Sequence, residues 1–488
     1  MLTKKNGIAI SLFSLTLIAA ACSPPRRVGG GSYYNNELAN MSTANIATVE
    51  ENPFIKTIDS ATSTFSIDAD GASYTLTRRK LNGYADFNYK GLRTEEMVNY
   101  FTYNYEDPAD DAPIGVNGEV STCPWNTAHK LIRIGIKGKS IPKEQYPLAN
   151  FVLLIDVSGS MASDDKLSLL KNGFTKFVNH MRPQDRIAIV TYSGYQSLAL
   201  ESTPGTEKVK IIKAINKLGS AGGTNGSGGI TLAYQIARQN FIPNGNNRVI
   251  MGTDGDFNVG ITSMDEVIKL VTDQRENGIF LTTLGVGIDN INDAMLEQLA
   301  NKGNGNYEYL DNHDELNKVF VNDYSKFLTV AKDVKVQVTF NKEVVENYRL
   351  IGYENRVMES KQFNNDQADA GEIGAGQTIT AIYEIEPKKN AAVSTAPTFT
   401  IHFRYKKPEA AVSIPLDLDI FDAGHSFESS SENMRFAASV AALGLYLRDS
   451  RYKGSMTLEQ IKSWSAGAVS FDPNGYRAQH LELLKIVK

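Results

Sequence analysis

Five side chains that could together bind a metal ion follow predicted strands or precede a predicted helix. They are Asp156, Ser158, Ser160, Thr224 and Asp254. Each offers a hydroxyl or carboxylate oxygen and none offers nitrogen or sulfur, which suits a hard cation such as Mg²⁺ or Mn²⁺. The hydroxyls of Ser158 and Ser160 stand two residues apart and can face one point, with the Asp156 carboxylate just ahead of them.

The elements that must position these side chains alternate between strands and helices. The apolar run 151–155 predicts a strand covered on both faces, and apolar residues at helical spacing over 167–181 predict the helix that follows. Further strands are predicted at 186–193, 248–252, 280–286 and 306–310, and further helices at 209–218, 229–241, 263–278 and 292–302. This alternation predicts an α/β domain with a doubly wound, mostly parallel sheet. Ligands of such sheets bind at the carboxyl ends of the strands, where the five side chains are expected.

The order Asp-x-Ser-x-Ser, then Thr, then Asp resembles the metal-ion-dependent adhesion site of the von Willebrand factor A (VWA) family. Together with the strand–helix pattern, the resemblance covers about residues 149–325 and implies a Rossmann-like fold. It also implies a bound Mg²⁺ ion, or Mn²⁺ or Ca²⁺, that Ser158, Ser160 and Thr224 contact directly. Asp156 and Asp254 would hold the ion directly or through water. One coordination position would stay open for an Asp or Glu of a protein partner.

Other chemistries fit the same residues less well. Ser158 is not in a G-x-S-x-G nucleophile elbow, and no Ser-His-Asp order is evident. The glycine-rich run 219–229 lacks the Lys followed by Ser or Thr of a phosphate-binding loop. Asp156 is not followed by the second Asp of a phosphatase motif. In a purely structural interpretation, the five oxygens only form turns and cap helices.

Two charged stretches ahead of the central domain are interpreted as structural. Asp68-Ala-Asp70-Gly resembles the start of a calcium loop, but Ala and Arg occupy the fifth and twelfth positions, where that loop needs ligands. The sequence therefore predicts a simple turn there. Arg93, with Glu95 and Glu96, is predicted to form a solvated helix face rather than a catalytic carboxylate pair.

The N-terminal residues indicate export. Lys4 and Lys5, followed by the apolar run 8–21, have the order of an export signal, and the run is shorter than the ~20 residues of a membrane span. The residues before Cys22 resemble a bacterial lipobox, although Ala19 stands where Leu, Val or Ile is preferred. The resemblance implies cleavage after residue 21 and acylation of Cys22, which would anchor the chain in a membrane.

The expected location is therefore that of an exported, membrane-anchored lipoprotein. Residues 22–60 are rich in Ser, Asn, Gly, Pro and Thr and predict a flexible linker between the lipid and the folded body. Ser23 stands where enteric bacteria place the Asp that retains lipoproteins at the inner membrane, which favours the outer membrane. The alternative is an ordinary secretory signal with an incidental cysteine. Cys123 is predicted to be a buried structural thiol.

The composition argues against several other classes of protein. Of the 488 residues, 50 are Lys or Arg and 55 are Asp or Glu, so the net charge of -5 lacks the basic excess of a nucleic-acid binder. Two cysteines are too few for a disulfide-stapled scaffold or a multi-cysteine zinc module. The six histidines include no His-x-x-x-His pair, which argues against a histidine-built zinc site.

The flanking segments complete the predicted organisation. It comprises a signal peptide (1–21), a linker (22–60), an N-terminal domain (61–148), the VWA domain (149–325), a β-rich domain (330–425) and a helical C-terminal domain (426–488). The flanks, which include Phe-Ser-Ile-Asp at 65–68 and Cys-Pro-Trp-Asn at 123–126, resemble those of the YfbK-like group of bacterial VWA lipoproteins. We expect the β-rich region to pack with the N-terminal strands as one sandwich, with the VWA domain as an insertion.

These observations predict a non-enzymatic cell-envelope lipoprotein that binds a protein partner through a divalent metal ion. The partner would supply an Asp or Glu to the ion, and no nucleic acid is expected to bind. The alternatives are a scaffold or assembly factor for an envelope complex with a structural metal ion, or an accessory subunit of an ATPase. An enzyme would require a hydrolytic activity that depends on Ser158 or Asp156.

Overall fold

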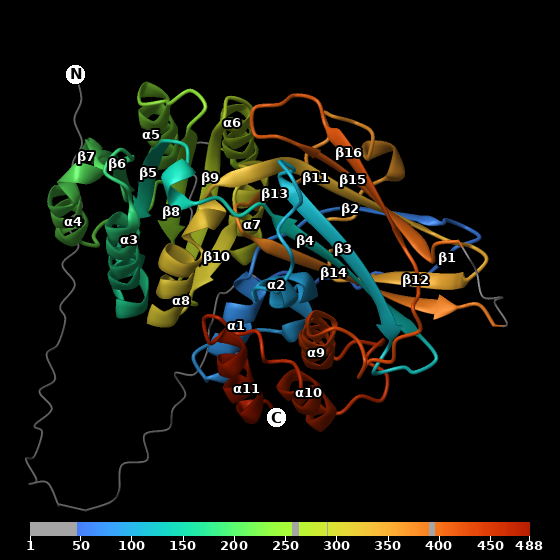
Figure 1. Ribbon diagram of the computed structural model, residues 1–488. Coiled ribbons are helices and arrows are strands. Elements are labelled where there is room, and N and C mark those ends of the chain that lie inside the picture. Colours follow the sequence, from blue (N-terminus) through green and yellow to red (C-terminus); the bar gives the residue numbers. More distant parts are fainter. Residues whose placement is uncertain (1–45, 256–262, 290, 390–395) are drawn as a thin grey trace, which may run out of the picture. The chain divides into compact units, whose positions relative to one another are not determined.

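Figure 1 shows the computed structural model, which describes residues 46–255, 263–289, 291–389 and 396–488. The predicted export signal, Cys22 and the first part of the predicted linker lie outside these residues. Among the helices of the described ranges, none has both the length and the apolar character that crossing a bilayer requires.

A six-stranded sheet forms the centre of the described structure, in the order β10-β9-β8-β5-β6-β7. Its strands are β5 (Ala149–Asp156), β6 (Arg186–Tyr192), β7 (Gln196–Pro204), β8 (Asn246–Thr253), β9 (Ile279–Val286) and β10 (Tyr307–Leu310). All run parallel except β7, which pairs antiparallel with β6. The predicted α/β class is thus confirmed. The sequence did not predict β7, because this edge strand is mostly exposed and carries only a weak apolar pattern.

Helices cover both faces of this sheet. They are α3 (Leu169–His180), α4 (Lys208–Lys217), α5 (Gly226–Gln239), α6 (Met264–Glu276), α7 (Asp293–Lys302) and α8 (His313–Asn317). Helices α5, α6 and α7 pack on the face that carries Val152 and Leu154, whereas α3, α4 and α8 pack on the face that carries Phe151 and Leu153. Successive side chains of a strand point to opposite faces, so the apolar run of β5 supplies both layers.

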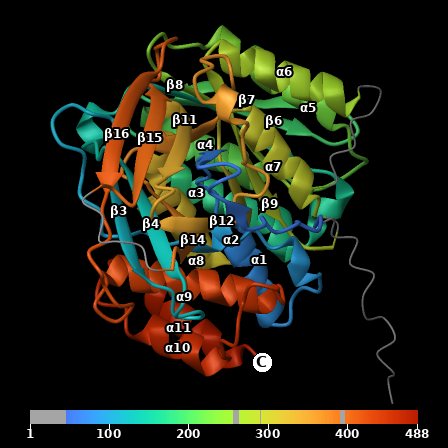
Figure 2. The ribbon, with the colours of Figure 1, turned by 90° about the vertical axis from the view of Figure 1, so that its right-hand side faces the viewer.

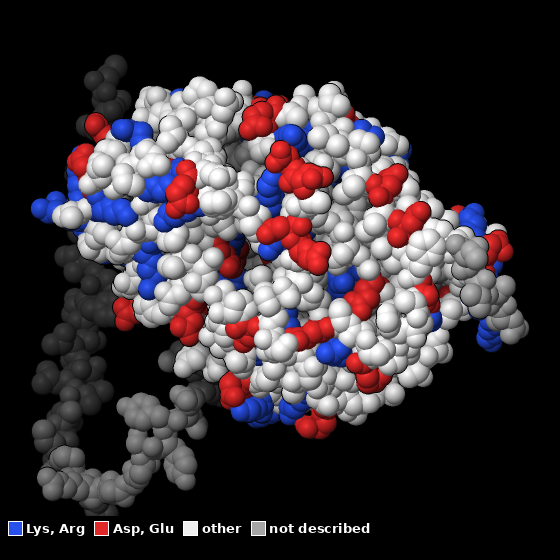
Figure 3. Space-filling model, in the orientation of Figure 1, with Lys and Arg blue, Asp and Glu red and all other residues white. Residues whose placement is uncertain are grey.

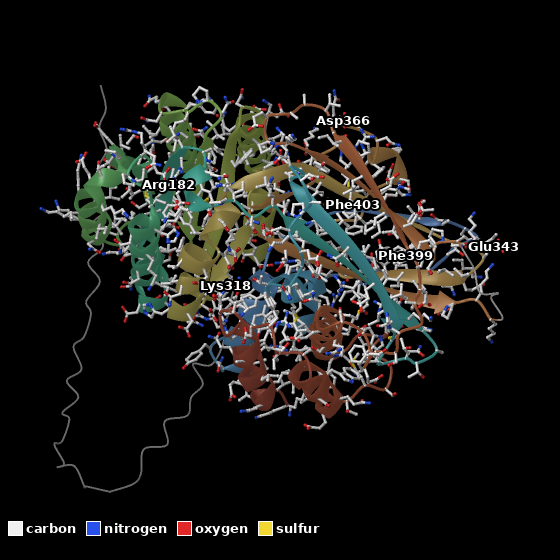
Figure 4. All side chains as sticks on the ribbon, in the orientation of Figure 1. Arg182, Lys318, Glu343, Asp366, Phe399 and Phe403 are labelled. Atoms are coloured by element: carbon white, nitrogen blue, oxygen red, sulfur yellow. The ribbon has the colours of Figure 1, made fainter. Side chains whose placement is uncertain are left out.

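Two further sheets, both antiparallel, lie on either side of a second core. One has the strand order β1-β12-β14-β4-β3, and the other β13-β11-β15-β16, with β2 also paired to β11. The early strands are β1 (Ile55–Lys56), β2 (Thr62–Ser66), β3 (Ile114–Thr122) and β4 (Lys130–Gly138). The late strands are β11 (Thr329–Phe340), β12 (Val345–Ile351), β13 (Gly371–Gly374), β14 (Thr378–Pro387), β15 (Phe399–Lys406) and β16 (Ile414–Ile420). On β15, Phe399 and Phe403 point into the core between the two sheets (Figure 4).

Strands from before and after the central sheet pair with one another in both antiparallel sheets. Strand β4 pairs with β14, where Ile134 lies opposite Ala381, and β2 pairs with β11, where Phe65 lies opposite Val336. The chain between β4 and β11 is therefore an insertion into one β-sandwich, as the sequence predicted. We call this insertion, which contains the central sheet, the inserted domain.

The C-terminal helices pack with two helices from the N-terminal segment. They are α9 (Glu432–Leu447), α10 (Leu458–Ala466) and α11 (Tyr476–Ile486), and they lie beside α1 (Ala72–Leu81) and α2 (Thr94–Asn99) in both Figure 1 and Figure 2. A capping box of Thr457 and Gln460 begins α10. Cys123 is buried in this core, which confirms the prediction of a buried thiol.

Lys318 links the inserted domain to these helices. Its side chain is buried and pairs with Asp323, and its ammonium lies 4.8 Å from the ring centroid of Tyr100 and 5.4 Å from that of Tyr476 (Figure 4). The pKa of Lys318 is raised because the charges of Asp323 and its acidic neighbours outweigh the cost of burial. The ammonium is therefore charged inside the interface.

The predicted solvated face of Arg93, Glu95 and Glu96 is wrong. All three are buried, with at most 4% of any of them exposed. Arg93 donates to Glu96 and also to Asp293 of α7, at 2.6 Å from Nη1 to Oδ2. The local sequence shows charges at helical spacing but not that α7, about 200 residues away along the chain, packs against them.

Charged side chains of both signs are scattered over the face shown in Figure 3. On the face shown in Figure 3, Lys and Arg are interspersed with Asp and Glu across the described residues. The mixture leaves no large field of one sign on that face.

Phe65 tests whether the N-terminal strand β2 belongs to the sandwich core. Its ring is fully buried, with centroid distances of 5.0 Å to Tyr353 and 6.2 Å to Tyr383. Phe65→Ala is expected to lower the free energy of unfolding by about 3–5 kcal/mol, because it removes a large buried ring and leaves a cavity. Urea denaturation of the purified chain measures this loss. The control is Ile58→Ala, at a side chain that is 75% exposed, and equal stability of the two variants would contradict the assignment.

Candidate metal centre

Asp156 is the last residue of β5 and is fully buried. Its Oδ1 accepts a hydrogen bond from the Ser158 amide at 2.9 Å, and its Oδ2 accepts one from the Thr253 hydroxyl at 3.0 Å. The first bond is the local turn that an Asp makes with the amide two residues on. The second joins the ends of β5 and β8, which are neighbours in the sheet.

The two serines follow in the turn that leaves β5. Their hydroxyl oxygens lie 3.0 Å apart, and Ser158 is buried whereas Ser160 is exposed. The pair thus extends from the buried Asp156 carboxylate to the surface. The spacing of two residues does place both hydroxyls together, as the sequence predicted.

Thr224 lies half-buried in the loop ahead of α5. This loop is joined to the serine turn by two backbone hydrogen bonds, from Ala221 to the Val157 carbonyl at 2.8 Å and from Gly159 to the Gly222 carbonyl at 2.9 Å. Gly222 has a φ of +82°, a conformation that favours glycine. The backbone therefore holds the Thr224 loop against the serines.

Asp254 directly follows β8 and is fully buried. Because β5 and β8 are parallel neighbours, their carboxyl ends bring Asp156 and Asp254 to the same edge of the sheet. Burial raises the pKa of Asp156 to about 6, with a smaller contribution from the charge of Asp254, although hydrogen bonds from Ser158 and Thr253 oppose the rise. Two deeply buried carboxylates at one edge of the sheet favour a cation beside them.

Lys166 supplies a positive charge to this site that the sequence did not predict. Its Nζ lies 3.1 Å from Asp254 Oδ2 and 3.1 Å from the Ser160 carbonyl oxygen, and only 5% of its side chain is exposed. Gly287, at a φ of +68°, makes room for it, because a Cβ there would lie 2.3 Å from Lys166 Cε. Lys166 lies in the helical segment Asp164–Ser168 just before α3, and its local sequence carries no signal of this role.

The donors at this edge fit a hard divalent cation. Two carboxylates, a pair of hydroxyls and the loop with Thr224 meet there, and every side chain of the predicted set offers an oxygen as its donor atom. The Lys166 ammonium balances one of the two buried negative charges, so a cation can still gain from the other. Tyr192 lines the buried side, where its own burial and the Asp156 charge raise the pKa of its hydroxyl.

Three models of known families match parts of this chain. The model of the von Willebrand factor type A domain matches residues 151–257, that of the von Willebrand factor matches residues 40–133, and that of the C-terminal part of the uncharacterized protein YfbK matches residues 325–488. The chain is 39% identical over 473 residues to the uncharacterized protein YfbK of Escherichia coli (strain K12). The match covers 92% of this chain and 82% of that protein. The chain belongs to the YfbK family of VWA proteins.

Other proteins are similar to parts of this YfbK-family chain at lower identity. The inter-alpha-trypsin inhibitor heavy chain H1 of Homo sapiens is 27% identical over 262 residues, or 49% of this chain and 28% of that protein. A von Willebrand factor type A structure from Catenulispora acidiphila is 13% identical and covers 79% of this chain and 91% of its own, with a TM-score of 0.44. The structure of the ArnB paralog VWA2 from Sulfolobus acidocaldarius is 15% identical, with a TM-score of 0.39. The match covers 77% of this chain and 97% of that one. Domains of the VWA type commonly mediate protein interactions and often bind a divalent metal ion.

Lys166→Met tests the electrostatics of this YfbK-family site. In metal-free buffer, it is expected to lower the free energy of unfolding by about 3–5 kcal/mol, because the buried Asp254 carboxylate loses the Lys166 ammonium. Chemical denaturation measures the loss, and adding Asp254→Asn should restore part of it. Lys269→Met, which removes an exposed i,i+4 pair with Asp273, is the control and should cost about 0–1 kcal/mol. A cost for Lys166→Met no larger than that of the control would contradict this account.

Proposed function

We propose that this protein binds a protein partner through a divalent metal ion at the carboxyl edge of the central sheet. The observation that carries the proposal is the cluster of oxygen donors at this edge, which runs from buried Asp156 and Asp254 to the exposed Ser160. Mg²⁺ is the ion proposed first, with Mn²⁺ and Ca²⁺ as substitutes, because all three prefer oxygen ligands.

The residues that would hold the ion comprise three neutral hydroxyls and two carboxylates. The neutral hydroxyls of Ser158, Ser160 and Thr224 would bind it directly, and Asp156 and Asp254 would bind directly or through water. When bound, the ion would act as a Lewis acid that accepts a carboxylate. Since few of its protein ligands would be charged, the ion would remain electron-poor. It would therefore bind the Asp or Glu carboxylate of a partner at the exposed end of the site.

Lys166 would set how strongly the ion is held. Its ammonium contacts the same Asp254 carboxylate that would face the ion, at 3.1 Å, and it is held there by the Ser160 carbonyl as well. Two cations beside one carboxylate repel each other, so Lys166 would weaken ion binding and leave the site more dependent on the partner's carboxylate.

A binding role is proposed in preference to an enzymatic one. Within the described residues, the contacts recorded for the Ser158 hydroxyl are with the oxygens of Ser160 and Asp156, and no histidine base appears among them. A serine nucleophile would need such a base within hydrogen-bond reach. The arrangement therefore supports ligation of a cation better than hydrolysis.

The proposed place of action is the cell envelope. Residues 1–21 would direct export, Cys22 would carry the lipid, and the linker to about residue 60 would let the folded body reach its partner, with the outer membrane as the favoured site. Lipidation and location are open to direct test by mass spectrometry of the mature N-terminus and by membrane fractionation of a Cys22→Ala variant.

Metal binding is tested with Mn²⁺ as the probe, because its EPR signal reports binding without a partner. Wild-type protein is expected to bind Mn²⁺ and Mg²⁺ to compete for the same site. Ser158→Ala and Asp156→Ala should weaken binding at that site at least tenfold while the far-ultraviolet circular dichroism stays unchanged. The control is Ser263→Ala, at the exposed capping box of α6, which should bind as the wild type does.

Partner binding is tested with immobilised protein and a solubilised envelope extract. We expect proteins retained in Mg²⁺ to be released by EDTA and to be absent from the Ser158→Ala column, because the ion is the bridge. Retention that is indifferent to EDTA and to Ser158→Ala would contradict the proposal. If the ion stabilises the fold while retention stays metal-independent, the protein is better described as a scaffold or assembly factor with a structural ion.

A further inference from the structure

A second acidic centre lies away from the serine turn, where the sandwich meets the inserted domain. A cleft of about 460 Å³ opens there, between the segment after β2, helix α7 and the loop after β12. The cleft is lined by Asp68 and Asp70 from the first element, Glu297 and Asn301 from the second and Arg356 from the third. Three parts of the chain that are distant in sequence thus present polar groups to one space.

Three buried carboxylates converge beside this cleft. Asp68, Asp70 and Glu96 of α2 each place a carboxylate oxygen within 4.8 Å of the other two. Asp68 Oδ1 accepts from the Asp70 amide at 3.0 Å, which is the turn that the sequence predicted. The sequence did not predict that Glu96 would face this turn, because the two lie on different elements.

One oxygen of this cluster has no hydrogen-bond donor. Asp70 is 2% exposed, and its Oδ1 accepts from the Tyr307 amide at 2.9 Å, but its Oδ2 accepts no hydrogen bond from any described residue. Arg356 shows where that oxygen points. Its Nε donates to Asp68 Oδ2 at 3.2 Å, and its Nη2 is 3.8 Å from Asp70 Oδ2, so both oxygens face the same guanidinium and hence the cluster.

The surroundings contain more negative than positive charge. Among the described residues, five carboxylates share two guanidinium groups there, those of Asp68, Asp70, Glu96, Asp293 and Glu297 with those of Arg93 and Arg356. Burial, followed by the Asp68 charge, raises the pKa of Asp70 well above its usual range. Burial, with the charges of Glu297 and Asp68, also raises the pKa of Glu96 to about 7, although Arg93 opposes it. A buried excess of this kind costs stability unless a cation or protons balance it.

We propose that Asp68, Asp70 and Glu96 form a second cation site, distinct from the serine turn, that takes a hard divalent ion of the Ca²⁺ class. Three protein carboxylates in an irregular arrangement suit Ca²⁺, whereas Mg²⁺ commonly uses one or two carboxylates and keeps several waters. The adjoining cleft gives the ion a route of entry and room for water ligands. Since Asp70 also binds Tyr307 of β10 and Arg356 binds Asn301 of α7, the ion would strengthen the attachment of the inserted domain to the sandwich.

The site is tested in the full chain with Ser158→Ala, which is expected to weaken ion binding at the first site. Equilibrium dialysis of chelator-treated protein against CaCl₂, followed by metal analysis, is expected to give one bound Ca²⁺ for Ser158→Ala. Adding Asp70→Asn should abolish that ion, and Ca²⁺ should raise the melting temperature of the first variant by about 2–4 °C but not that of the second. Glu96→Gln is a second variant with the same expected loss.

The control and the contrary outcomes separate this inference from the proposed function. Asp311→Asn, at a buried carboxylate that pairs with Arg78 outside the cluster, should keep the bound Ca²⁺ in the Ser158→Ala background. The inference is overturned if Ser158→Ala binds no Ca²⁺, or if Asp70→Asn and Glu96→Gln leave the bound ion in place. In that event Mn²⁺ binding at the serine turn would be unaffected. Conversely, loss of metal-dependent partner retention with the second ion still bound would contradict the proposed function alone.

Discussion

The burial of carboxylates is the constraint on which this structure depends. A buried carboxylate is costly unless amides, hydroxyls or cations compensate it, and the molecule buries such groups at two edges of the inserted domain. At one edge, Asp156 and Asp254 are compensated by the Ser158 amide, the Thr253 hydroxyl and the Lys166 ammonium. At the other edge, Arg93 and Arg356 provide the compensation, but five carboxylates share these two guanidinium groups. The positions that could bind a cation are therefore those where the fold leaves negative charge only partly balanced.

The insertion of one domain into another explains how these edges are held. Strand β4 ends where the inserted domain begins, and β11 starts where it ends, while β4 and β11 belong to opposite sheets of the sandwich. Each antiparallel sheet contains strands from before and from after the inserted domain. The sandwich therefore depends on contacts between residues that are far apart in the sequence. The two ends of the inserted domain are thereby both joined to strands of one sandwich. Helices α1 and α2 and the C-terminal helices share a further core.

Much of the geometry of the candidate metal centre could be predicted from the sequence because its parts are local. The turn at Asp156 and the meeting of the Ser158 and Ser160 hydroxyls depend on residues two positions apart. The approach of Asp254 follows from a general property of parallel sheets, whose strands end at one edge. Lys166 could not be predicted in the same way. Its position depends on Asp254, 88 residues away, and on the space left by Gly287.

The sequence by itself determined the α/β pattern, the core strands, the C-terminal helices and the oxygen-rich set of side chains, because apolar periodicity and short motifs act within a few residues. Only the tertiary structure decided which charges are buried. Arg93, Glu95 and Glu96 have the pattern of a solvated helix face, yet all three are buried, and Arg93 pairs with Asp293 of α7. Asp68 and Asp70 form the predicted turn, yet Glu96 and Arg356 complete a cluster around it. The environment of a charge is set by whatever packs against it, and here those partners come from distant parts of the chain.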